Sequence, residues 1–178
     1  YVSGVTLALF GEEERAQILQ IAMQVRQSGG AVVFDPNYRP RLWARPELAR
    51  DAFLSFAQAA SIVLPTFDDE AMLFGDANPA QTQLRWRSAG VAEIVVKIGS
   101  RGCVLCDGTI VGPVGPLMPI DTTGAGDAFN AGYLAARRHG ASEIEAAGFA
   151  NLLAGRVIGQ PGAIMPRDEM PEFPFVGR

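Results

Sequence analysis

The strongest constraint on the fold is a regular alternation of short apolar runs with longer segments of helical period. The runs are almost entirely hydrophobic, which is typical of parallel strands buried on both faces. Such strands are expected at residues 31–34, 62–64 and 94–97, with helices at 12–28, 47–60, 66–74 and 79–89. This succession predicts an α/β fold in which helices cover both faces of a mostly parallel sheet.

The C-terminal part of the chain predicts a hairpin followed by two helices. Asp107 and Gly108 are typical of a two-residue turn within a hairpin at residues 103–111. Helices are expected at 126–139 and 142–158, and Ser142 with Glu145 forms a capping-box pattern at the second. The chain begins with Tyr1, and its first four residues have the pattern of a strand's end. We therefore expect a segment of a longer protein.

Composition and charge narrow the class of protein. The formal net charge is −4 and the isoelectric point is about 5.0, without a basic run, which disfavours nucleic acid as a partner. No apolar run reaches the ~18 residues needed to cross a bilayer, so we expect a cytoplasmic protein without a membrane contact. Cys103 and Cys106 have C-x-x-C spacing, but no second ligand pair follows and His139 is distant. Two reduced thiols are expected rather than a zinc or redox site.

The segment at residues 121–127, Asp-Thr-Thr-Gly-Ala-Gly-Asp, carries the clearest chemistry. Gly124, Ala125 and Gly126 are small residues at the start of a predicted helix, where backbone N–H groups bind anions such as phosphate. A carboxylate beside a bound phosphate is unfavourable unless it has a task. Deprotonation of an attacking hydroxyl by Asp127 is such a task. The alternative is a tightly packed helix start with an acid that favours the helix dipole.

With the residues that follow, Ala-Phe-Asn-Ala-Gly-Tyr, this segment resembles the C-terminal signature of the ribokinase-like, or PfkB, carbohydrate kinases. The resemblance covers essentially the whole chain. It implies a three-layer α/β/α fold whose N-terminal half and lid strands are absent from residues 1–178, and phosphorylation of a sugar hydroxyl by ATP with Mg²⁺. By this resemblance Asp127 is the catalytic base and residues 124–126 form the anion hole. Asp121 and Thr123 correspond to residues that hold K⁺ in several relatives.

Other segments resemble the family's nucleotide-binding residues. The turn containing Lys97, Gly99, Ser100 and Gly102 resembles its nucleotide-binding loop, although alone it is as typical of a hairpin entry. The chain lacks the G-K-[ST] of a P-loop. Asn151 occupies a position that approaches the ribose or base, unless it is a polar residue on the helix surface. Thr66 and Asp69 replace the Asn and Glu of an Asn-x-x-Glu motif that positions Mg²⁺ through water, and Asp69 alternatively serves the helix dipole.

Residues 35–43, Asp-Pro-Asn-Tyr-Arg-Pro-Arg-Leu-Trp, point to the substrate. Arg39 and Arg41 follow a predicted strand, and guanidinium groups fit carboxylates and phosphates, although surface arginines are the alternative. The sequence of residues 35–43 resembles that of the family branch that phosphorylates the sugar acid 2-keto-3-deoxygluconate. It implies that Asn37, Tyr38 and Arg39 lie on the nucleotide-phosphate side, and we expect Arg39 to contact the substrate.

Three alternatives stay open. The chain could belong to a fructokinase or a ribokinase of the same family, or to a nucleotide-binding remnant without activity. Residues 159–163 lack an acid that contacts the sugar in some relatives. A homo-oligomer is compatible with the resemblance.

Overall fold

A four-stranded parallel sheet organises the first compact unit, Tyr1–Ile98, of the computed structural model, which describes residues 1–115 and 118–175. Its strands lie in chain order, and each pairs in parallel with the next: β1 (Val2–Ser3), β2 (Val33–Asp35), β3 (Ile62–Val63) and β4 (Glu93–Ile94). Val2 lies opposite Phe34, and Phe34 opposite Val63. A parallel bridge also joins Thr66 to Lys97 of β5 (Val96–Lys97). The polar residues Asp35 and Lys97 are the last residues of their strands.

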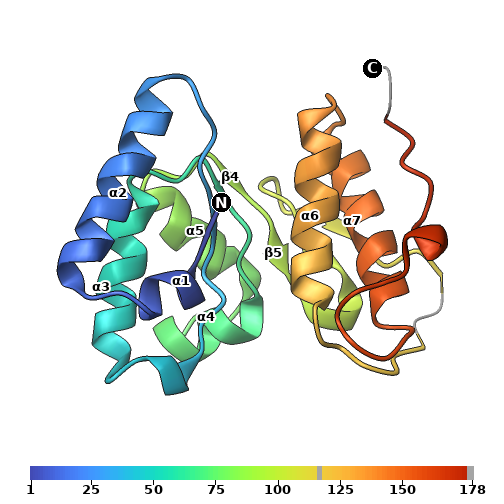
Figure 1. The fold of residues 1–178 in the computed structure, drawn as a ribbon, viewed down its shortest axis with the longest axis horizontal. Helices are drawn as coiled ribbons and strands as arrows, with labels where there is room; N and C mark the ends of the chain where they lie inside the picture. The colour runs from blue at the N-terminus through green and yellow to red at the C-terminus, as the bar shows by residue number, and fades with distance from the viewer. Residues whose placement is uncertain (116–117, 176–178) are drawn as a thin grey trace. The chain divides into compact units, whose positions relative to one another are not determined.

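Helices alternate with these strands, as Figure 1 shows: α1 (Gly4–Ala8), α2 (Glu12–Gln27), α3 (Pro46–Ala57), α4 (Phe67–Phe74) and α5 (Pro79–Ser88), with a 3-10 turn η1 (Pro40–Leu42). Aromatic residues of α3 and α5 meet around Phe34, which is fully buried. Its ring centroid lies 5.3 Å from Phe53, 5.0 Å from Phe56 and 5.9 Å from Trp86. This aromatic core fixes the β2 strand, and with it the loop that leaves the strand at Asp35.

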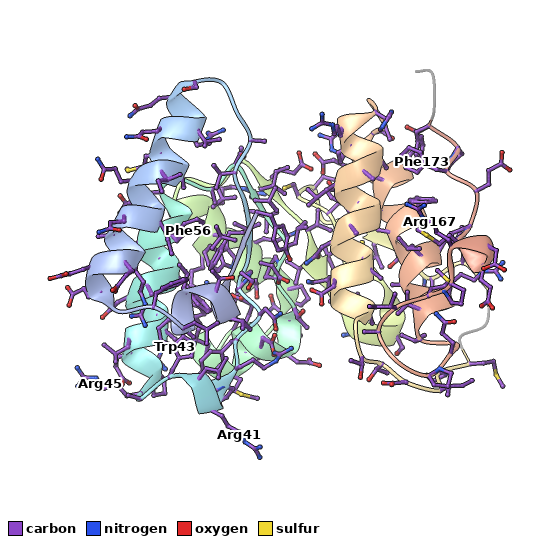
Figure 2. The ribbon with its side chains drawn as sticks, viewed as in Figure 1. Arg41, Trp43, Arg45, Phe56, Arg167 and Phe173 are labelled. Carbon is purple, nitrogen blue, oxygen red and sulfur yellow. The ribbon has the colours of Figure 1, made fainter. Side chains whose placement is uncertain are left out.

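The second compact unit, Gly99–Arg178, is built around two helices, α6 (Ala125–Arg138) and α7 (Glu143–Val157), which lie side by side (Figure 1). It also contains strands β6 (Cys103–Val104) and β7 (Ile110–Val111), which pair antiparallel, and 3-10 turns η2 (Gly99–Arg101) and η3 (Arg167–Glu169). The segment after η3 returns to the helices. There Phe173, labelled in Figure 2, lies with its ring 5.2 Å from His139 and 5.3 Å from Phe149.

Most predicted elements are confirmed within one or two residues, because local side-chain period and capping residues determine them. The capping box of Ser142 and Glu145 is present. Helix α1 was not predicted; Ser3 opens it by accepting a hydrogen bond from the Thr6 N–H at 3.1 Å. Thr66 is the N-cap residue of α4, but its side chain makes no capping hydrogen bond.

The turn of the β6–β7 hairpin also differs from the prediction. A two-residue Asp-Gly turn needs a positive φ at both residues, but only Gly108, at 88°, has one. The Gly108 N–H donates to the Leu105 carbonyl at 2.9 Å, and the Leu105 N–H donates to Thr109 at 2.8 Å. Residues 106–108 therefore form a three-residue loop, in which glycine takes the left-handed position. Cys103 lies buried in β6, whereas Cys106 lies in this loop, and the two do not form a disulfide.

Within residues 1–115 and 118–175, no helix is both long and apolar enough to cross a membrane.

Candidate active site

In the first unit, polar side chains gather where the parallel strands end. Asp35 ends β2 and Lys97 ends β5, and both are buried. The Lys97 Nζ lies 3.4 Å from Asp35 Oδ1, and the Tyr1 hydroxyl donates to Asp35 Oδ2 at 3.1 Å. Burying either side chain alone would be costly, and the contact between them offsets part of that cost. The predicted contribution of Lys97 to nucleotide binding stays a prediction, and the anion at its ammonium group in this structure is Asp35.

The loop after β2 has a strained backbone at Asn37. Among the described residues, Asn37 is the one non-glycine residue with a positive φ, 36°. Its Oδ1 atom is buried and has no hydrogen-bond partner in the described part of the chain. Strain of this kind, with an unpaired polar atom, is typical of binding loops. The neighbouring Tyr38 is buried in the core against Phe53, so its role in the loop is packing, and its contact with nucleotide stays a prediction.

Arg39 and Asp69 come together from two segments that are distant in sequence. The Arg39 Nη1 lies 3.2 Å from Asp69 Oδ2, and Arg39 stays half-exposed while Asp69 is mostly covered. Burial raises the pKa of the Asp69 carboxyl, while Arg39 acts in the opposite direction. Arg41, by contrast, extends from η1 into solvent, as Figure 2 shows. The structure thus joins the predicted phosphate-side arginine to the predicted magnesium residue and leaves Arg41 outside this cluster.

In the second unit, helix α6 begins at Gly124 in a left-handed conformation. The φ of Gly124 is 79°, which costs a residue with a side chain appreciable strain. A Cβ atom there would lie 2.8 Å from the Cβ of Ala163 and 3.0 Å from its carbonyl oxygen. The Ala125 N–H donates to Thr122 at 3.3 Å, so it is partly engaged. The N–H groups of Gly126 and Asp127 follow in the first turn, where no helical carbonyl precedes them.

Asp121 ties this helix start to the segment that follows α7. Its Oδ1 accepts the Thr123 N–H at 2.9 Å and its Oδ2 accepts the Gly162 N–H at 3.0 Å. The hydrogen bonds from Thr123 and Gly162 lower the pKa of the Asp121 carboxyl. Each carboxylate oxygen of the half-buried Asp121 keeps a further lone pair, and its contact with K⁺ stays a prediction. Thr123 is exposed beside it.

Asp127 stands in the first turn of α6 with its side chain exposed. Its position in the turn places a carboxylate next to backbone N–H groups that favour anions. An exposed carboxylate on a helix can accept a proton from a hydroxyl that approaches it. The arrangement therefore places an exposed carboxylate within three residues of a helix start whose N–H groups favour anions.

A cavity of about 620 Å³ lies in the same unit, next in the chain to Asp121. It is mostly apolar, with one arginine, and is lined by Val114, Met118, Pro119, Ile120, Leu152, Gly155, Arg156 and Gly159. The Ile120 and Asp121 N–H groups both donate to the Ile158 carbonyl, at 2.7 and 3.2 Å, so one segment joins the cavity wall to the helix start. Its size is that of a site for a cofactor or a small molecule.

Two predicted nucleotide-binding features have structural roles in this unit. The Asn151 amide is buried and donates to the Val111 and Gly112 carbonyls at 2.8 and 3.1 Å, so it holds the end of β7 against α7. Its contact with a nucleotide stays a prediction. Gly99 and Ser100 are exposed in η2, and Gly102 approaches the Val111 carbonyl so closely that a Cβ atom would lie 2.1 Å from it.

The structure adds features that sequence reasoning missed. The cavity is one, and the pairing of Asp35 with Lys97 is another, because residues 62 positions apart give no local signal. No cluster of three or more His, Cys, Asp or Glu that could hold a metal lies within the described residues. Magnesium in phosphoryl-transfer sites uses one or two carboxylates with waters and substrate phosphates. A single carboxylate such as that of Asp69 is therefore compatible with this pattern.

The chain is similar in sequence and structure to characterised sugar kinases. The family described as pfkB family carbohydrate kinase matches residues 1–170. Over 177 residues the chain is 40% identical to the 2-dehydro-3-deoxygluconokinase of Escherichia coli K12, and the match covers 96% of this chain and 57% of that protein. The chain thus spans little more than half the length of that relative.

Solved structures give the same result for the fold. Aminoimidazole riboside kinase from Salmonella enterica, complexed with aminoimidazole riboside and an ATP analog, matches with a TM-score of 0.80 at 27% identity, over 92% of this chain and 57% of that one. A double mutant of fructokinase from Vibrio cholerae O395, with fructose, ADP and potassium bound, matches with a TM-score of 0.78 at 25% identity, over 91% and 54%. These likenesses confirm the predicted ribokinase-like α/β fold.

Proposed function

Because the chain belongs to the pfkB family of carbohydrate kinases, we propose that it is the C-terminal, catalytic part of a kinase for 2-keto-3-deoxygluconate. The reaction transfers the terminal phosphoryl group of ATP to a hydroxyl of this sugar acid and yields 2-keto-3-deoxy-6-phosphogluconate. The observation that carries the proposal is the start of α6. There the exposed Asp127 carboxylate follows the left-handed Gly124 and the first-turn N–H groups.

In this proposal Asp127 accepts the proton of the attacking hydroxyl, which makes the oxygen a better nucleophile. The N–H groups of residues 124–126 stabilise the negative charge on the transferring phosphoryl group. Both tasks need the helix start to hold still. The hydrogen bonds of Asp121 to Thr123 and Gly162 support that requirement.

The apolar cavity beside Ile120 supports a place for the base of ATP. Its lining by Met118, Ile120 and Leu152 suits the flat faces of a purine, and Gly155 and Gly159 leave room for it. The aminoimidazole riboside kinase that this chain resembles binds an ATP analog. In the first unit, the loop of Asn37 and Arg39 with Asp69 would handle phosphates, and Asp69 would contact Mg²⁺ through water. Bound Mg²⁺ would supply charge neutralisation for the phosphates.

The choice of substrate depends on sequence similarity and on Arg39. The 40% identity to a 2-dehydro-3-deoxygluconokinase extends over nearly the whole chain. The half-exposed guanidinium of Arg39 could also reach a carboxylate of a sugar acid, since only one of its nitrogens contacts Asp69. A neutral sugar would have no group that needs this charge.

A substrate panel on the full-length protein tests the proposal. Release of ADP is measured in a coupled assay with 2-keto-3-deoxygluconate, fructose, ribose and gluconate. We expect the highest kcat/KM with 2-keto-3-deoxygluconate. A clear preference for fructose or ribose would replace the substrate by that of the related kinases, and ADP release with none of the four would leave a nucleotide-binding remnant.

A further inference from the structure

A buried ion cluster connects α4 to the segment around α5. The cluster, here called the Arg85 clamp, consists of Glu70, Asp76 and Arg85. The Arg85 Nη2 lies 2.5 Å from both Glu70 Oε2 and Asp76 Oδ2. The Glu70 side chain is 1% exposed, and its Oε2 also accepts the Trp86 Nε1–H at 3.0 Å. The clamp therefore fixes one face of α4 from two directions.

The guanidinium of Arg85 is held by aromatic rings as well as by carboxylates. Its carbon lies 3.6 Å from the centroid of the Phe74 ring and 5.1 Å from that of Trp86. Asp76 is also fixed, because it accepts the Thr82 hydroxyl at 2.8 Å. An arginine between two carboxylates and two rings has little freedom to move. The side chain of a lysine could not reproduce this planar, forked arrangement.

The clamp packs two helices together through buried charges, which is energetically costly. Buried ion pairs are desolvated, and well-packed apolar residues often give equal or greater stability. Here one nitrogen, Arg85 Nη1, is buried without a hydrogen-bond partner among the described residues, which adds to the cost. Stability alone is therefore a poor explanation of the clamp, whereas control of a precise helix position is a documented use of buried polar groups.

What the clamp holds in place is the first turn of α4. Glu70 follows Asp69 directly, and both lie in that turn. On its other side the turn is held by the pair of Arg39 and Asp69. Helix α4 has eight residues, too few for a stable helix without tertiary contacts. The first turn of α4 is thus held at two neighbouring carboxylates, Glu70 by Arg85 and Asp69 by Arg39.

We propose that Arg85, through Glu70, is a positioning residue for Asp69 on the nucleotide-phosphate side of the kinase. This inference rests on the proposed function, because it gives Asp69 a task in nucleotide binding. Arg85 itself touches neither substrate in this scheme. Loss of the clamp lets the first turn of α4 shift and weakens the contribution of Asp69 to the binding of nucleotide with Mg²⁺.

A double-mutant cycle on the full-length protein tests this dependence. ADP binding is measured by calorimetry, with and without MgCl₂, for wild type, R85M, D69N and the R85M/D69N pair. We expect R85M and D69N each to weaken Mg-dependent ADP binding about five- to tenfold, and the pair to be no weaker than D69N alone. Binding of ADP without Mg²⁺ should change less than twofold. E47Q, which removes an exposed carboxylate paired with Arg50, is the matched control and should bind as wild type.

Each outcome decides a different claim. Effects of R85M and D69N that multiply in the pair, or normal Mg-dependent binding by a folded R85M, would overturn the positioning role and leave the kinase assignment intact. A wild type that binds no ADP would overturn the proposed function and the inference together. R85K keeps the charge but cannot bridge both carboxylates, so it should show a smaller loss than R85M. If R85M does not fold, the R85K and D69N cycle gives the same decision.

Discussion

At the scale of single residues, Gly124 and Asp127 divide the work of the helix start. Gly124 supplies a backbone conformation, and Asp127 supplies a carboxylate. The left-handed φ of 79° and the contact with Ala163 leave no room for a side chain at residue 124. Asp127 is exposed in the first turn of α6. Substitution of Gly124 should therefore disturb the backbone geometry, whereas substitution of Asp127 should remove the carboxylate and leave the geometry in place.

The substitution G124A should destabilise the protein and reduce its activity. The left-handed conformation alone costs an alanine roughly 1–2 kcal/mol, and the new Cβ would lie 2.8 Å from that of Ala163. We expect a loss of about 2 kcal/mol or more in the free energy of unfolding by urea. G148A is the control, because Gly148 lies inside α7 with open space around it, and alanine there should stabilise by up to about 1 kcal/mol. Equal effects of the two substitutions would contradict the geometry of the helix start.

At the scale of elements, the contact between α4 and the α5 region contains an ionisable group in an apolar setting. Burial raises the pKa of Glu70 to about 7, against the attraction and hydrogen bond of Arg85 and the hydrogen bond of Trp86, and Asp76 raises it further. The folded protein therefore binds a proton that the unfolded chain releases near the ordinary value of 4.5. Stability from this group is fully present below pH 4.5 and is lost as the pH rises through about 7.

The substitution E70Q should remove this pH dependence. Relative to E70Q, wild type should lose unfolding free energy between pH 5 and 7, by up to about 1.4 kcal/mol for each pH unit, and the difference should level off above pH 8. Urea unfolding of both proteins at pH 5, 6, 7 and 8 measures it. E47Q, an exposed carboxylate on α3, should run parallel to wild type. Parallel curves for E70Q would show that Glu70 does not change its protonation on folding.

At the scale of the whole molecule, local sequence patterns predicted the helices and strands. They did not predict the pairing of residues that are distant in the sequence. The helices at Glu12–Gln27 and Glu143–Val157 were predictable because their period and caps lie within one segment. The motif at residues 121–127 was predictable for the same reason. The pairing of Asp35 with Lys97 and of Glu70 with Arg85 depends on how segments fold together. No period or spacing encodes such partners.

For several predicted site residues, the structure shows which groups their side chains contact. Arg39 was predicted from the chemistry of its guanidinium, and the structure adds its partner Asp69. Asn151 was predicted as a nucleotide residue from its place in the last helix, but its amide holds the β7 strand end. Tyr38 was assigned to the same site and is buried in the aromatic core. In each case the residue type indicated a polar role, whereas the fold determines which group the side chain contacts.

The turnover of D127N in the full-length protein tests most directly the proposal that Asp127 is the catalytic base. Removal of a general base lowers turnover by roughly 10²–10⁴-fold, so D127N should show a kcat reduced by that factor with 2-keto-3-deoxygluconate while it binds ATP as wild type does. D168N, which neutralises an exposed aspartate in η3, is the control and should keep full activity. A kcat of D127N within a few-fold of wild type would contradict the assignment of Asp127 as the base.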